Sequence, residues 1–180
     1  SKKKLNNFIK KIEIISNNAI KIGIKYLIFP FLESSSPNNK LKFNKFILLI
    51  KIIKKKIPED LMILIETDLN PPKVEIFLKE MKNKVFINYD IGNSASKDFN
   101  FNKEKKYFKY VKNIHLKDRK KHGATVRFGS GNANFKKLFI FLSKNIHNYD
   151  FTLQPARSTY NKDIKEIKLN IEYIKKLLSN

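Results

Sequence analysis

The 180-residue sequence contains no cysteine, and this absence excludes a disulfide framework, thiolate catalysis and a thiolate metal site. Long hydrophobic runs are also missing. The longest, YLIFPFL and FILLI, are far too short to cross a bilayer. The start, SKKKLNNFIKKIEII, is basic but lacks the continuous apolar stretch of a signal peptide. We therefore expect a cytoplasmic protein with no membrane partner.

Acidic residues are scarce as well: 16 Asp and Glu face 38 Lys and Arg, which gives a formal net charge of +22. Such a charge first suggests a nucleic-acid partner. The abundance of Lys, Asn and Ile, whose codons are rich in A and T, gives a simpler explanation by coding bias. We therefore expect no nucleic-acid partner. Under such a bias a retained arginine indicates function better than a lysine, because only arginine has a planar, bidentate fork.

Length and a hydrophobic content of 42% predict one folded domain over residues 1–180. Apolar runs ending in polar residues alternate with amphipathic segments, at about 25 residues per pair, which predicts parallel strands joined by helical crossovers in an α/β fold. The expected strands lie in YLIFPFL, LMILIETD, KVFINYD, IHLKD and FTLQ. The expected helices are residues 5–21, 43–56, PPKVEIFLKEM, KEKKYFKYVKN, NFKKLFIFLSKNI and 161–178.

Three polar residues at expected strand ends form a candidate site. Glu66, Asp90 and His115 each follow the one before by about 25 residues, one strand–helix unit. If their strands are neighbours, the strand ends lie about 5 Å apart. Two carboxylates and one imidazole suit Mn²⁺, Zn²⁺ or Mg²⁺. A lone acid at a strand end is more often a helix cap, and a lone histidine is more often a core residue. Three such residues at the ends of consecutive expected strands favour a site.

The segment 113–135 concentrates residues that are rare elsewhere. Three of the five glycines, two of the three arginines and two of the three histidines fall within it. Together with its neighbours it resembles the sugar-phosphate isomerase/epimerase family, which has the xylose-isomerase-like TIM barrel and includes L-ribulose-5-phosphate 3-epimerases and hexulose-phosphate isomerases. The resemblance rests on an ordered series of motifs: FPFLESSS, ILIETD, YDIGN, HLKDR, FGSGNANF and LQPARS.

The resemblance implies a metal-dependent isomerase or epimerase acting on a sugar or sugar phosphate, with a homo-oligomer compatible with it. The implied metal ligands are Glu66, Asp90, His115 and Gln154. Glu66 is the implied base, which removes a proton beside a carbonyl to leave an enediolate. The glycine loop is implied to close over the substrate. The implied substrate-binding residues are Asn93, Lys117, Arg119 and Arg157.

Two departures from the family pattern limit what the resemblance implies. Gln154 stands where the better-known epimerases have a glutamate that acts as second acid/base, so a one-base isomerisation fits better than a two-base epimerisation. The five strands correspond to strands four to eight of a (β/α)8 barrel, and strands one to three are missing. We therefore expect an incomplete barrel, either a fragment of a longer gene product or a degenerate copy. The alternatives are a non-catalytic sugar-binding remnant and, with only three histidines to build a zinc cluster, a barrel endonuclease acting on DNA.

Overall fold

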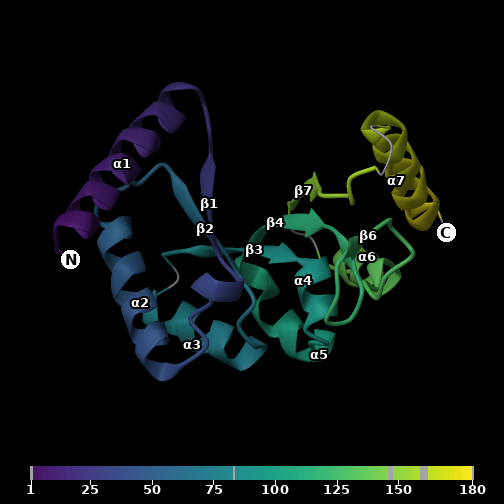
Figure 1. The fold of residues 1–180 in the computed structure, drawn as a ribbon, viewed down its shortest axis with the longest axis horizontal. Helices are drawn as coiled ribbons and strands as arrows, with labels where there is room; N and C mark the ends of the chain where they lie inside the picture. The colour runs from purple at the N-terminus through teal and green to yellow at the C-terminus, as the bar shows by residue number, and fades with distance from the viewer. Residues whose placement is uncertain (1, 83, 146–147, 159–161, 180) are drawn as a thin grey trace. The chain divides into compact units, whose positions relative to one another are not determined.

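A computed structural model describes residues 2–82, 84–145, 148–158 and 162–179. It has the α/β fold expected from the sequence, with five parallel strands in the order β1-β2-β3-β4-β7 and a two-stranded ribbon, β5-β6 (Figure 1). The strands are β1 (Tyr26–Phe31), β2 (Met62–Thr67), β3 (Phe86–Asp90), β4 (Val111–Leu116), β5 (Asp118–Arg119), β6 (Thr125–Val126) and β7 (Asp150–Leu153). The helices are α1 (Lys2–Lys21), η1 (Glu33–Ser35), α2 (Lys40–Lys54), α3 (Pro71–Glu80), α4 (Ile91–Ser96), α5 (Phe101–Glu104), η2 (Lys105–Tyr110), α6 (Phe135–Ser143) and α7 (Asp163–Leu178).

Contacts divide the chain into two compact units, residues 1–87 and 88–180. In the first unit β1 and β2 are parallel, with Tyr26 opposite Met62 and Phe31 opposite Thr67. Strand β2 continues the sheet to β3 through the pair Ile65 and Ile87. The middle of β2 is fully buried, as expected for a parallel strand covered on both faces.

Helices α2 and α3 begin where side-chain caps satisfy their first backbone N–H groups. The Asn39 side chain accepts a hydrogen bond at the start of α2, and the Asn70 side chain does so for α3, which then opens with a proline. The two helices meet through Phe46 and Phe77, whose ring centroids are 4.7 Å apart, and lie side by side in Figure 1. This contact joins the buried faces of the two helices.

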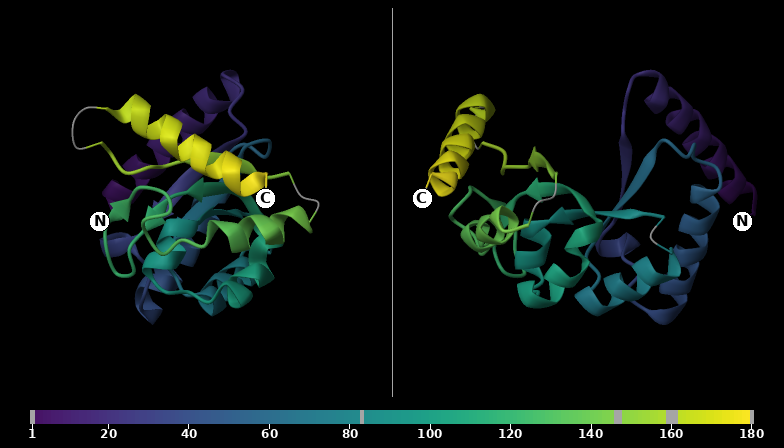
Figure 2. Two further views of the ribbon diagram at one scale, coloured as in Figure 1. Left: turned by 90° about the vertical axis from the view of Figure 1, so that its right-hand side faces the viewer. Right: turned by 180° about the vertical axis from the view of Figure 1, so that it is seen from behind.

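The second unit is built on β4 and β7, which pair in parallel with His115 opposite Thr152. A cluster of aromatic rings around Phe108 fills the space beside the sheet; the Phe141 ring lies 5.0 Å from it. The predicted helix over KEKKYFKYVKN is instead the short α5 followed by a 3-10 turn, η2, because β4 already begins at Val111. Helix α7 packs against α6, and the two are neighbours in both views of Figure 2.

Among the described helices none combines the length and the apolar character that crossing a bilayer requires.

Candidate metal centre

Asp90 is the last residue of β3 and also the cap of the next helix. Its Oδ1 accepts a hydrogen bond from the Asn93 N–H at 2.8 Å, which starts α4. Its Oδ2 accepts one from the Lys117 ammonium at 2.9 Å. The side chain is 1% exposed. The carboxylate is therefore a helix cap and also the partner of the Lys117 ammonium, so capping does not exclude a further role for Asp90.

His115 lies on β4 with its imidazole buried. Its Nδ1 is 3.1 Å from the Asn88 amide nitrogen and 4.0 Å from Asp90 Oδ2. The nitrogen that faces the carboxylate is thus also the one that the Asn88 amide contacts. Asn88 is a neighbour that sequence reasoning missed, although its position two residues before Asp90 puts it on the same face of the strand.

Glu66 is the buried carboxylate near the end of β2. Glu66, Asp90 and His115 each present one ligand atom, and these atoms lie within 4.8 Å of one another. Two carboxylates and an imidazole form a donor set that suits a divalent cation. The ammonium of Lys117 on Asp90 shows that this carboxylate already accepts positive charge. The residues present therefore fit a metal ion, whose identity the donor set leaves open among Mn²⁺, Zn²⁺ and Mg²⁺.

Gln154 directly follows β7. Its backbone N–H donates to the Leu116 carbonyl at 2.9 Å, which extends the pairing of β4 with β7 by one residue. Its side chain is half-buried. The role of Gln154 as a fourth ligand stays a prediction.

Two of the four predicted substrate-binding residues, Asn93 and Lys117, contact Asp90, and Arg119 contacts Asn93. The Asn93 N–H donates to Asp90 Oδ1, and Asn93 Oδ1 accepts from Arg119 Nη1 at 3.0 Å. Arg119 also donates twice to the Gly123 carbonyl, at 3.1 and 2.9 Å. Lys117 contacts Asp90 directly. Arg119 therefore holds the start of the glycine loop at Gly123, while Lys117 lies at the Asp90 carboxylate.

Arg157, the fourth predicted substrate residue, lies in a different hollow. It is exposed and lines a cavity of about 380 Å³ with Arg127, Lys162, Lys165 and Glu166. Arg127 forms an ion pair with Glu166 there. Two of the three arginines of the chain thus share one strongly basic hollow.

The glycine loop is held by a buried carboxylate that the sequence analysis did not single out. Asp118 Oδ2 accepts from the N–H groups of Gly129 and Gly131 at 2.9 and 2.8 Å, and Oδ1 accepts from Ala133 at 3.0 Å. Closure of this loop over a substrate stays a prediction. The HLKDR motif was the available signal, because an aspartate before a Gly-x-Gly segment can accept the N–H groups of a tight turn.

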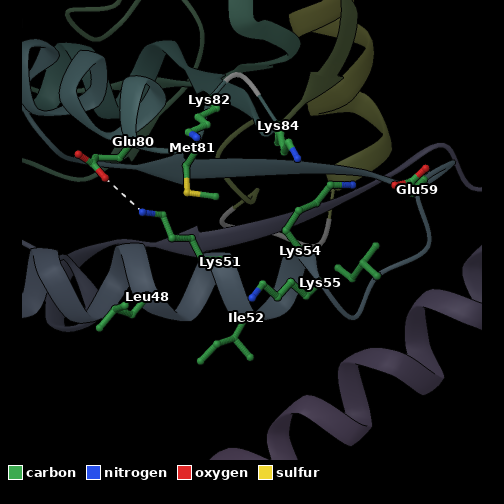
Figure 3. A pocket seen from close by; sticks show the side chains of 11 residues that line it. Leu48, Lys51, Ile52, Lys54, Lys55, Glu59, Glu80, Met81, Lys82 and Lys84 are labelled. Atoms are coloured by element: carbon green, nitrogen blue, oxygen red, sulfur yellow. Dashed lines mark hydrogen bonds and ion pairs between the residues drawn. The ribbon is translucent and has the colours of Figure 1, made fainter.

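A larger hollow in residues 1–87 lies away from all the predicted site residues. It measures about 940 Å³ and runs between α2 and the end of α3 (Figure 3). Its polar lining consists of five lysines and two glutamates, and Lys51 and Glu80 pair across it at 3.2 Å. It contains none of the predicted site residues, so size alone does not mark the site.

Comparison with known proteins supports the fold. No protein family and no curated protein matches the sequence. Among solved structures, a xylose isomerase domain protein from Planctomyces limnophilus matches 94% of this chain and 63% of its own, at 18% identity and a TM-score of 0.71. A sugar phosphate isomerase/epimerase from Parabacteroides distasonis matches 96% of this chain and 67% of its own, at 14% identity and a TM-score of 0.73.

A third match is a xylose isomerase-like TIM barrel protein from Mycobacterium smegmatis, solved in complex with magnesium. It matches 96% of this chain and 67% of its own, at 14% identity and a TM-score of 0.67. The chain thus spans less than two thirds of the Planctomyces protein and about two thirds of the other two. Its fold is that of an incomplete xylose isomerase-like barrel.

Proposed function

We propose that this chain carries the metal-binding part of a sugar or sugar-phosphate isomerase or epimerase. The observation that carries the proposal is the buried group of Glu66, Asp90 and His115. Its members come from β2, β3 and β4, and the carboxyl ends of barrel strands are where such enzymes keep their active sites. The fold likeness to a protein described as a sugar phosphate isomerase/epimerase supports the same reaction class.

In the proposed reaction Glu66 acts as the base. Glu66, Asp90 and His115, with Gln154 as a neutral fourth ligand, would hold a divalent ion. That ion supplies polarisation of a carbonyl and stabilisation of negative charge on oxygen. Glu66 accepts the proton from the carbon beside the substrate carbonyl, and the electron pair of the broken C–H bond forms the double bond of an enediolate. The carbonyl π pair moves onto its oxygen, which takes the proton of the adjacent hydroxyl, and Glu66 returns its own proton to the former carbonyl carbon, which gives the isomeric sugar.

The chemistry of Gln154 favours isomerisation by one base. An amide cannot accept or deliver a proton as a carboxylate does. An epimerisation that needs a second acid on the opposite face of the substrate would lack that acid here. Lys117, whose ammonium lies 2.9 Å from Asp90, adds positive charge that would favour an oxyanion nearby.

The first test replaces the proposed base. In Glu66→Gln, we expect loss of solvent deuterium incorporation into a panel of ketoses and ketose phosphates, while Mn²⁺ affinity falls but persists because two ligands and an amide oxygen remain. Nuclear magnetic resonance measures the deuterium, and electron paramagnetic resonance measures bound Mn²⁺. The exposed Glu59 provides the matched control, Glu59→Gln.

Two outcomes would contradict this proposal. Deuterium incorporation that is unchanged in Glu66→Gln removes Glu66 from the role of base. A wild-type chain that binds none of Mn²⁺, Zn²⁺ or Mg²⁺ favours the non-catalytic remnant instead.

We further propose that the substrate sugar carries a phosphate. The hollow of Arg127, Arg157, Lys162 and Lys165 lies on the segments that follow β4 and β7 and at the start of α7. In many barrels a phosphate binds at the loops after the last two strands, near a helix N-terminus. Arginine suits phosphate because its planar fork donates two parallel hydrogen bonds. We propose that this hollow receives the phosphate of the sugar.

Substitution of one arginine tests the phosphate site. Arg157→Gln should weaken inorganic phosphate binding by about ten- to a hundredfold, since a hydrogen bond to a charged group contributes roughly 1.5–3 kcal/mol. The control is Lys54→Gln, which removes a positive charge from the hollow of Figure 3 instead. Phosphorus resonance titration gives both affinities. Equal weakening in the two variants would indicate attraction by net charge alone and overturn the site.

A further inference from the structure

A chain of hydrogen bonds runs through the second unit and ends on the imidazole of His115. The Thr152 hydroxyl donates to Asn113 Oδ1 at 3.2 Å, and Asn113 Nδ2 donates to Asn88 Oδ1 at 2.6 Å. The Asn88 amide nitrogen then lies 3.1 Å from His115 Nδ1. Three polar side chains thus connect the exposed strand β7 to a buried histidine.

The strands place these residues in one layer beneath the metal centre. Asn88 precedes Asp90 by two residues on β3, and Asn113 precedes His115 by two on β4. Side chains two residues apart in a strand point to the same face. Asp90 and His115 therefore each have an asparagine two residues earlier on the same strand, with its side chain on the same face.

Because both amides are buried, the hydrogen-bond partners inside the protein decide which way each oxygen and nitrogen points. Asn88 is 1% exposed and Asn113 is fully buried, so neither amide can turn to water for a partner. An amide offers an oxygen that accepts and a nitrogen that donates. When the Asn113 oxygen accepts from Thr152, its nitrogen is left for the Asn88 oxygen. The Asn88 nitrogen is then left for the imidazole.

We infer that Thr152, Asn113 and Asn88 are positioning residues that fix the neutral tautomer of His115, with its lone pair on Nδ1 and its proton on Nε2. Nδ1 is 4.0 Å from Asp90 Oδ2 and accepts the Asn88 hydrogen bond on its lone pair. A cation that coordinates Nδ1 would take the place of that hydrogen bond.

The tautomer is a property of the metal-free protein, so its test is independent of the proposed function. Histidine labelled with ¹⁵N shows which ring nitrogen carries the proton, at about pH 8.5 where ordinary imidazoles are neutral. The signals of His115 are assigned by their absence in His115→Asn. We expect at least about a fivefold excess of the Nε2–H form, the equilibrium constant for one net hydrogen bond of about 1 kcal/mol. A dominant Nδ1–H form would show that the hydrogen bonds from Thr152 to His115 have the opposite donor-to-acceptor direction, and would overturn the inference.

The decisive variant changes a residue that does not touch the imidazole. In Asn113→Asp both oxygens accept, so Asn88 must turn its nitrogen toward residue 113 and its oxygen toward His115. His115 then has to donate from Nδ1, and we expect the tautomer ratio to reverse. Asn134→Asp makes the same chemical change at the exposed cap of α6 and should leave the ratio as in the wild type.

Two further variants keep the inference open to disproof if Asn113→Asp does not fold. Asn88→Asp removes the donor itself and should also give the Nδ1–H form. Thr152→Val removes only the outermost hydroxyl, on an exposed strand, and should reduce the excess of Nε2–H without reversing it. A folded Asn113→Asp or Asn88→Asp protein with an unchanged ratio would overturn the positioning role.

Discussion

The Asp118 carboxylate accepts hydrogen bonds from backbone N–H groups. It is fully buried and accepts three N–H groups of the glycine loop, so it fixes the path of that segment. A Cβ added to Gly131 would lie 2.1 Å from Asp118 Oδ1, and one added to Gly129, whose φ is +83°, would lie 2.8 Å from the Tyr173 ring. The glycines gather here because the loop leaves no room for larger residues.

Gly131→Ala should therefore destabilise the protein by roughly 1–3 kcal/mol, the cost of leaving a buried polar group without its partners. Urea unfolding measures the change. Asp118→Asn should lose a comparable amount, because its amide nitrogen would face N–H donors. Wild-type stability in both variants would show that the loop does not depend on this carboxylate.

Glu104 is a further buried carboxyl, outside the group of candidate ligands. It accepts from Ser94 Oγ at 2.8 Å and from the Tyr89 hydroxyl at 3.1 Å. Burial raises its pKa above the ordinary value of 4.5, against the opposing effect of these hydrogen bonds. The folded state therefore holds this proton to a higher pH than the unfolded state does, and the group lowers stability as pH rises from about 4.5 through its folded pKa.

Glu104→Gln removes that dependence on pH. Relative to wild type, the variant should gain stability as pH rises from about 4 to about 7, because its amide carries no charge to bury. Denaturant unfolding at several pH values gives the difference. A constant difference across that range would contradict a raised pKa for Glu104.

At the scale of elements, α4 and the candidate centre share Asp90. Asn caps a helix about as well as Asp, so Asp90→Asn should keep α4 and the stability of the fold while weakening divalent metal binding by tenfold or more. Asp90→Ala should lose both, with a stability cost of about 0.5–2 kcal/mol. Calorimetric metal titration and urea unfolding separate the two effects.

The control for the two Asp90 variants removes the N-cap of a different helix. Asn70→Ala removes the side-chain cap of α3 and should reduce stability by a similar amount without changing metal affinity. If Asp90→Asn bound the ion as tightly as wild type, Asp90 would be a helix cap and no more.

The elements were largely predictable, because apolar periodicity and caps are local signals. The Pro-Pro start of α3 and the amphipathic stretch of α2 appear where the sequence predicted them. The ribbon of β5 and β6 was missed, since two-residue strands carry no periodicity. The sequence predicts a regular helix where the 3-10 turn η2 lies, because the aromatics of this segment suggest one apolar helix face.

The centre was predictable in part. Spacing alone singled out Glu66, Asp90 and His115, because one strand–helix unit separates consecutive strand ends. The hydrogen-bond partners Asn88, Asn113 and Lys117 depend on which strands are neighbours and on how side chains turn. Asparagines in apolar strands two residues before a ligand were the available signal, and a sequence gives no way to pair them.

At the scale of the whole molecule the net charge of +22 is the dominant feature. Like charges repel one another in the compact state more than in the expanded chain. Raising sodium chloride from about 20 to about 300 mM shortens the Debye length to less than 10 Å and should raise the melting temperature by several degrees. Tetramethylammonium chloride at equal ionic strength is the control and should act alike. A fall in the melting temperature with both salts would contradict net repulsion.

The double duty of Asp90 has an evolutionary consequence. Selection for a stable helix would preserve this aspartate even in a descendant that had lost the proposed metal chemistry. Glu66 is not the N-cap of any helix in the described part of the chain, so helix capping gives no reason to retain it. Among distant homologues, joint retention of Glu66 and His115, rather than the presence of Asp90, is therefore the genetic signature of the proposed metal centre.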